Sequence, residues 1–244
     1  MDYLLGIDIG TSGTKGVLMD REGKIYARAG REYSIDIPQP DWAEQDPKIW
    51  WEATIQSVRK VIKESEINPQ QIRGIGLSGQ MHGTVFLDKD LQPFRPAIIW
   101  ADQRSSSQCE LIYQKIGKER LAELTGSPVV TGFMCSTLLW MKENQPEMCN
   151  KIYKVILAKD YIRYRLTGNL GTEVTDASST LLLDIKRRCW SEELLDVLGL
   201  PLKILPGEVH ESQEIAGYLL TEAAKDTGLL EGIPVVYGGG DQSM

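Results

Sequence analysis

A turn rich in glycine and hydroxyl groups follows the first strand-like segment and carries residue types that hold phosphate. Asp8 ends the segment, and Gly10, Thr11, Ser12 and Lys15 come after it. Glycines let the backbone turn tightly and present N–H groups, while hydroxyls and a lysine add donors and positive charge. A carboxylate beside phosphates can hold Mg²⁺, usually through waters. The turn predicts a phosphate site, and its plain alternative is an ordinary hairpin turn.

A second polar turn, SGQMHG, lies between two strand-like segments and includes Met81 and His82. Its glycines allow a ligand to approach the backbone closely. His82 could hydrogen-bond a hydroxyl-rich ligand, although a lone histidine is more often a satisfied structural residue. His210 lacks such neighbours and is assigned no role.

Two further segments place carboxylates after strands. Trp100 is followed by Asp102 and Arg104, an arrangement that could pack on a sugar and bind its hydroxyls, or form a core tryptophan beside an exposed ion pair. Asp241 follows three glycines, where it could take a proton from a hydroxyl that attacks phosphorus. The alternative for Asp241 is a disordered tail.

The elements that must position these residues begin with a three-stranded meander over residues 3–9, 15–20 and 24–34. No helix follows the first glycine turn, which excludes a Rossmann unit, and no GxxxxGK[ST] segment is present. Asp46 and Pro47 predict the start of a helix that runs to about residue 66. Later patterns predict strands at 72–77, 84–88, 97–100, 152–158, 215–219 and 234–237, and helices at 105–124, 136–144, 159–166, 194–198 and 221–227. We read a mixed α/β domain with a helical insertion at about 104–150.

Composition narrows the class of protein. The chain has 244 residues, of which 42% are hydrophobic and 25% charged, and a formal net charge of −7. These values are typical of a globular protein, and the acidic balance argues against a nucleic-acid partner. The four cysteines form no C-x-x-C pair, and no apolar run is long enough to cross a membrane. We therefore expect a reduced, cytoplasmic protein without a membrane partner.

Taken together, the motifs resemble the FGGY carbohydrate kinases of the actin-like, ribonuclease-H-like ATPase superfamily. The resemblance is carried, in family order, by GIDIGTSGTKGVLMD, DWAEQDPKIWWEAT, SGQMHG, RPAIIWADQRS, KDYIRYRLTG, TEVTDASST and GGGDQ. It covers essentially the whole chain and is strongest for the members that act on D-xylulose. It implies an α/β domain with a mixed five-stranded sheet, helices on both faces and a helical insertion.

The resemblance also implies a role for each matching residue. Asp8 would be the carboxylate linked to Mg²⁺, and Asp241 would be the base that activates the primary hydroxyl of a ketose for attack on the γ-phosphate of ATP. The residues that would line the ATP phosphates are Gly10, Thr11, Ser12 and Lys15. The residues that would contact the sugar or lie near it are Met81, His82, Trp100, Asp102 and Gln242.

The implied activity is the phosphorylation of D-xylulose to D-xylulose 5-phosphate by ATP. Thr137 stands where lysine is frequent, and Ala101 stands where asparagine is common in the members that act on xylulose, whereas Phe133 is kept as a wall of the sugar site. Gluconate and ribulose therefore stay open as substrates. A non-catalytic sugar-binding module on the same fold is the alternative of another class.

The resemblance assigns residues 1–237 to an N-terminal sugar-binding domain and residues 238–244 to the start of a C-terminal nucleotide-binding domain. Because that second lobe would bind adenosine, we expect the 244 residues alone to be inactive. The sequence does not determine the oligomeric state, and the resemblance leaves a homodimer of the full-length enzyme open because dimers are common in the family.

Overall fold

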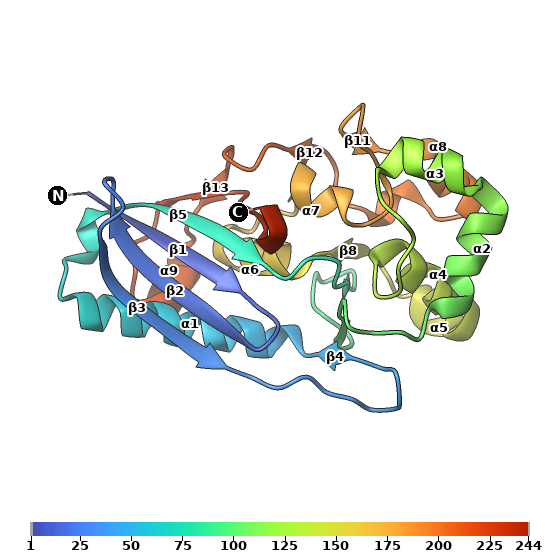
Figure 1. The fold of residues 1–244 in the computed structure, drawn as a ribbon. Coiled ribbons are helices and arrows are strands. Elements are labelled where there is room, and N and C mark those ends of the chain that lie inside the picture. The colour runs from blue at the N-terminus through green and yellow to red at the C-terminus, as the bar shows by residue number, and fades with distance from the viewer. Residues whose placement is uncertain (1, 244) are drawn as a thin grey trace.

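The computed structural model describes residues 2–243 and has a sheet at one end and a mainly helical part at the other (Figure 1). The strands of the main sheet are β1 (Tyr3–Ile9), β2 (Gly13–Asp20), β3 (Ile25–Glu32), β5 (Ile72–Gly79), β13 (Ile215–Tyr218), β14 (Pro234–Val236) and β15 (Gly239–Gly240). Their spatial order is β13-β14-β5-β1-β2-β3, and β15 also pairs with β5. The meander predicted for the first three strands is confirmed.

The sheet is mixed because β5 runs parallel to β1, β14 and β15, while the remaining pairs are antiparallel. The α/β fold class is confirmed, but the sheet has seven described strands where five were expected. One addition is β13, which pairs as an antiparallel edge strand with β14. The other arises because Gly238, at φ +77°, divides the last strand into β14 and β15.

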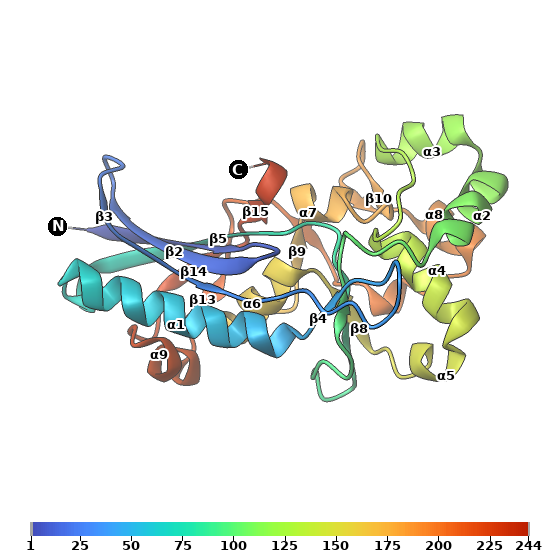
Figure 2. The same cartoon turned by 60° about the horizontal axis from the view of Figure 1, so that its bottom comes forward.

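Three helices pack along one face of this sheet, namely α1 (Pro47–Ser65), α6 (Ala158–Thr167) and α9 (Thr221–Thr227). They contact one another, and α1 and α9 lie on the same side of the sheet in Figure 2. The predicted cap of α1 is confirmed, since the Asp46 side chain accepts a hydrogen bond from the Lys48 amide at 3.0 Å.

The opposite face of the sheet is largely open among residues 2–243, so the expected helical layers on both faces are reduced to one. In β1, Leu5, Ile7 and Ile9 are buried, whereas Leu4 is exposed and Asp8 is half-buried. This alternation has the period of a strand with one covered face. A hollow of about 1310 Å³ lies over the open face and includes Asp8 in its lining.

The mainly helical part has a hydrophobic cluster of its own. It contains α2 (Ser106–Ile116), α3 (Lys118–Thr125), α4 (Met134–Asn144), α5 (Pro146–Cys149), α8 (Glu192–Leu198), β10 (Leu183–Asp184) and β11 (Cys189–Trp190). The helix expected over residues 105–124 is broken at Gly117, whose φ is +84°. The insertion at 104–150 is also completed by residues 181–205, which contribute apolar side chains to the same cluster.

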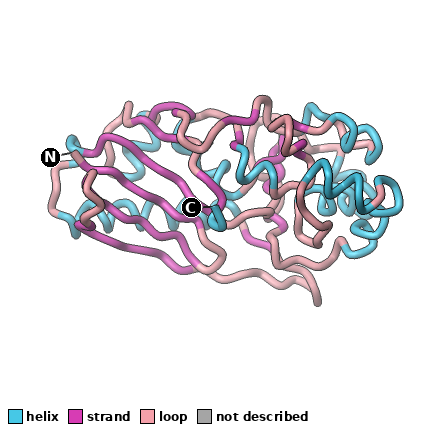
Figure 3. Tube along the Cα trace, turned by 45° about the horizontal axis from the view of Figure 1, so that its top comes forward, coloured by secondary structure: helices cyan, strands magenta, loops and turns pink. Residues whose placement is uncertain are grey.

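Short elements join the two parts, and Figure 3 shows the strands gathered at one end and most helices at the other. These elements are β4 (Glu44–Gln45), β6 (Val85–Leu87), β7 (Ala97–Ile98), β8 (Lys154–Ile156), β9 (Thr172–Glu173), α7 (Val174–Ser178) and β12 (Val209–His210), with 3₁₀ turns at Pro69–Gln71, Leu202–Ile204 and Asp241–Ser243. No helix in the described part of the chain is long and apolar enough to cross a membrane.

A substitution at Gly238 tests how closely the end of the chain packs against β5. A Cβ atom at Gly238 would lie 2.1 Å from the Leu77 carbonyl oxygen, and its φ of +77° already disfavours side chains. We expect Gly238→Ala to lower the free energy of unfolding by about 3 kcal/mol or more, measured by urea denaturation.

Gly232 is the matched control, since its φ is +81° but nothing lies within 4 Å of its ideal Cβ position. Gly232→Ala should lower the free energy of unfolding by only about 1–2 kcal/mol, which is the cost of holding alanine in a left-handed conformation. Equal losses for the two variants would contradict a clash at Gly238.

Candidate active site

One row of paired residues crosses the open face of the sheet. Asp8 of β1 pairs with Lys15 of β2 on one side and with Ser78 of β5 on the other, and Ser78 pairs with Gly239 of β15. Neighbouring strands lie about 4.8 Å apart, and directly paired residues point to the same face. The ladder therefore sets Lys15, Asp8 and Ser78 in line and brings the glycine run before Asp241 to the same row.

The pKa of Asp8 responds to burial and to two charged groups, Lys15 and Asp241. Burial raises the pKa of its carboxyl group, Lys15 and a hydrogen bond from Ser78 partly offset that rise, and the negative charge of Asp241 adds to it. A bound cation would favour the charged form of a half-buried carboxylate such as Asp8. Asp8 therefore fits the metal-linked role that the sequence predicts.

The turn over residues 10–15, called the phosphate turn here after its predicted role, has a backbone held by hydrogen bonds and two exposed side chains. The Gly10 amide donates to the Gly13 carbonyl at 3.0 Å, and the Tyr33 hydroxyl donates to the Gly10 carbonyl at 2.6 Å. Burial raises the pKa of Tyr33 to about 12, so this hydroxyl remains a donor at neutral pH. The side chains of Ser12 and Lys15 are exposed, which leaves a hydroxyl and an ammonium group free to meet an anion.

Two buried glutamines, which the sequence analysis did not single out, support the same turn. Gln45 donates to the Thr11 carbonyl at 2.8 Å and accepts from Trp50 at 3.1 Å and from Gln80 at 3.0 Å. Each amide both donates and accepts, so it can join two backbone segments. The sequence offered one signal for these glutamines, because Gln45 lies in the EQDP segment and Gln80 in the SGQMHG segment.

His82 lies on the turn between β5 and β6, and its ring is fixed on two sides. Its Nδ1 lies 3.0 Å from the Ser179 carbonyl, and its ring stacks on Phe133 with centroids 3.9 Å apart. Since a carbonyl can only accept, Nδ1 carries the proton and Nε2 is left as an acceptor. Burial lowers the pKa of His82, which keeps the ring neutral, although Ser179 and Asp241 oppose that shift.

Trp100 connects the sugar-side residues to the phosphate turn. Its indole N–H donates to the Thr11 hydroxyl at 2.9 Å, while 49% of the residue remains exposed. An exposed indole face held by one hydrogen bond is suited to packing on the apolar face of a sugar.

Asp102 is not brought to the exposed surface with the other predicted site residues. It is fully buried, and its carboxylate accepts from the Ala43 amide at 2.7 Å and from the Arg104 amide at 3.0 Å. It also forms an ion pair with Arg104 at 2.7 Å, so the exposed ion pair considered from the sequence is buried instead. These contacts fix the turn around Asp102, and its place near a sugar stays a prediction.

Asp241, Gln242 and Met81 are the remaining predicted site residues, and they lie at or beside the end of β15. Asp241 and Gln242 are exposed in the 3₁₀ turn that follows β15. Met81 packs on Gly240, where a Cβ atom would lie 2.7 Å from Met81 Cγ. The negative charge of Asp241 acts to raise the pKa of both Asp8 and His82.

Comparison with known proteins identifies the family of the chain. The model of the FGGY family of carbohydrate kinases, N-terminal domain, matches residues 3–244. A xylulose kinase of Lactococcus lactis is 41% identical over 243 residues, which are 100% of this chain and 48% of that relative.

Two solved structures from Lactobacillus acidophilus are each 30% identical with a TM-score of 0.92. One is named a gluconate kinase and the other a ligand-bound xylulose kinase, and the matches cover 98% and 99% of this chain and 48% of each structure. The chain thus spans about half the length of the relatives it matches. With a family match over residues 3–244 and a site built on the sheet, the chain belongs to the FGGY family of carbohydrate kinases.

Proposed function

We propose that this chain is the sugar-binding part of an ATP-dependent kinase that phosphorylates D-xylulose to D-xylulose 5-phosphate. The observation that carries the proposal is the strand pairing that sets Lys15, Asp8 and Ser78 in one row with the glycine run before Asp241. The name of the 41% identical relative supports xylulose, while a structural neighbour named for gluconate keeps that sugar acid as the second candidate.

Asp241 is proposed as the general base. The sugar hydroxyl gives its proton to the carboxylate as its oxygen bonds to the γ-phosphorus of ATP, and the bond from that phosphorus to the bridging oxygen of ADP breaks. Asp241 is exposed at the end of β15, where a sugar held beside His82 and Trp100 would reach it. Positioning supplies much of the rate increase in such reactions.

Asp8 and the phosphate turn are proposed to receive Mg²⁺ and the phosphates. When bound, Mg²⁺ supplies charge neutralisation of the phosphate oxygens. Magnesium is commonly held by one or two carboxylates together with waters and substrate phosphates. A half-buried Asp8 beside the exposed Ser12 and Lys15 meets that requirement. We also propose a cytoplasmic location, which the free cysteines support.

His82 and Trp100 are proposed to select the sugar. With its proton on Nδ1, His82 presents Nε2 as an acceptor and so requires a hydroxyl donor. Phe133 limits the space on one side of that ring by stacking. Gln242 would add an amide to the sugar contacts.

A substrate panel tests the choice of sugar. The full-length protein should release ADP in a coupled assay with D-xylulose at a kcat/KM at least about tenfold above that with gluconate or ribulose, because a site built for a particular hydroxyl pattern rejects mismatched ones. Activity on gluconate alone would overturn the xylulose assignment and leave the kinase assignment standing. Absence of turnover with every sugar, alongside measurable sugar binding, would favour the non-catalytic module.

Replacing the proposed base tests the chemistry. Asp241→Asn in the full-length protein should lower kcat about 10²- to 10⁴-fold, with little change in sugar affinity, because the amide cannot accept the proton. Asp226→Asn is the matched control, since Asp226 is exposed on α9, which lies on the helical face of the sheet. Retained turnover in Asp241→Asn would refute the base assignment.

A further inference from the structure

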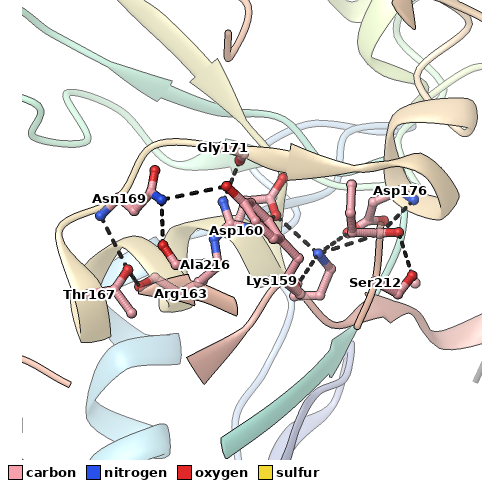
Figure 4. Close-up of polar contacts among 12 residues, drawn as sticks. Lys159, Asp160, Arg163, Thr167, Asn169, Gly171, Asp176, Ser212 and Ala216 are labelled. Atoms are coloured by element: carbon pink, nitrogen blue, oxygen red, sulfur yellow. Dashed lines mark hydrogen bonds and ion pairs between the residues drawn. The ribbon is translucent and has the colours of Figure 1, made fainter. Parts of the chain in front are cut away.

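Five charged side chains lie fully buried behind the glycine run, and the proposed mechanism uses none of them. Lys159, Asp160 and Arg163 come from α6, Glu173 from β9 and Asp176 from α7, and Figure 4 shows the polar contacts that surround this cluster. The Lys159 ammonium lies 3.0 Å from Asp160, 3.3 Å from Asp176 and 3.6 Å from Glu173. Burying charges is costly even when they are paired.

The buried cluster holds the glycine run at both of its ends. At the start, Lys159 Nζ donates to the Tyr237 carbonyl at 3.1 Å. At the end, the Gly240 amide donates to the Thr175 hydroxyl at 2.9 Å, and that hydroxyl donates to Glu173 at 2.8 Å. The three glycines between these anchors have no side chains with which to fix themselves.

Thr175 is well suited to hold the Gly240 amide. Its hydroxyl gives its own proton to the Glu173 carboxylate, and a charge-assisted bond of this kind is stronger than a neutral one. Glu173 is fixed in turn, because it accepts from the Thr175 and Asp176 amides at 2.8 and 2.9 Å and from the Ser212 hydroxyl at 2.9 Å. The orientation of the amide before Asp241 therefore depends on a buried carboxylate.

The charges of the cluster nearly balance at neutral pH. Two cations face three carboxylates, and burial raises the pKa of Asp176 to about 7 despite the nearby Lys159. Burial also acts to raise the pKa of Asp160, but Lys159 and Arg163 outweigh it and keep that carboxyl ionised. A proton on Asp176 brings the cluster close to neutrality, which lessens the cost of burying it.

We propose that Thr175 is a positioning residue for Asp241 and that Lys159 and Glu173 form the buried anchor through which it acts. This inference rests on the proposed function, because it assigns the anchor to the base of that reaction. Gly240 directly precedes Asp241, so a shift of its backbone moves the carboxylate away from the sugar hydroxyl.

Thr175→Val and Thr175→Ser test the inference in the full-length protein. Valine removes the acceptor of the Gly240 amide, and we expect kcat to fall about 10- to 100-fold while the KM for xylulose stays within about threefold, because a small displacement of a reacting group is costly. Serine keeps the hydroxyl and should restore kcat to within about threefold of the wild type. Should the valine variant fail to fold, Thr175→Ala removes the same hydroxyl without a second branch on Cβ and should give the same loss.

Ser178→Ala is the matched control beside the same cluster. The Ser178 hydroxyl donates to the Thr175 carbonyl at 2.7 Å and takes no part in the bonds that join Gly240, the Thr175 hydroxyl and Glu173, so kcat should remain near the wild-type value. Unchanged kcat in Thr175→Val, a loss in Thr175→Ser as large as in Thr175→Val, or a loss in Ser178→Ala equal to that in Thr175→Val would each overturn the proposal.

A second measurement separates the anchor from the proposed reaction. Hydrogen exchange at the Gly240 amide should be slow in the wild type and in Thr175→Ser and clearly faster in Thr175→Val, whatever sugar the protein uses. If the wild type phosphorylates no sugar but this pattern holds, the kinase assignment fails while the anchor stands. Equal exchange in all three proteins would refute the anchor itself.

Discussion

The pairing of β5 with β1 on one side and with β15 on the other is the interaction on which the rest of the site depends. This pairing fixes how far Asp8 lies from the glycine run. The spacing from β1 to β5 and the spacing from β5 to β15 are both set by backbone hydrogen bonds rather than by flexible side chains. Gly238 allows β15 to pair with β5. Because glycine has no Cβ atom, the chain can pass close to the Leu77 carbonyl at this point. The open face of the sheet then becomes the surface on which the polar groups meet.

Around this ladder, buried polar groups stabilise the exposed turns. Gln45 and Gln80 hold the phosphate turn from below, and the cluster centred on Lys159 holds the glycine run. Polar networks of this kind are costly unless every member is satisfied, which favours one arrangement over its alternatives. The backbones of the two turns are thus fixed by buried groups, while Ser12, Lys15 and Asp241 have exposed side chains.

The first strands and the glycine turn between β1 and β2 could be predicted from sequence because their signals are local. Glycine turns, alternating apolar residues and the Asp46 cap each act within a few positions, and Asp8 and Lys15 follow from one short segment. The burial of Asp102 could not be predicted, because it depends on the Ala43 amide, which is 59 positions away. The elements β9 and α7 were missed because they have two and five residues and owe their form to tertiary contacts.

The residues proposed to contact the sugar lie on different structural elements from those proposed to contact the phosphates. Asp8 lies within a strand of the ladder, whereas His82 and Phe133 lie on a turn and at the start of α4, held by a ring stack. A change in the ring stack can alter the shape of the sugar surface without moving a strand. For protein engineering, this separates two libraries: the rim formed by the turn and the helical part can be randomised for new acceptors, while the ladder is left intact as the common scaffold.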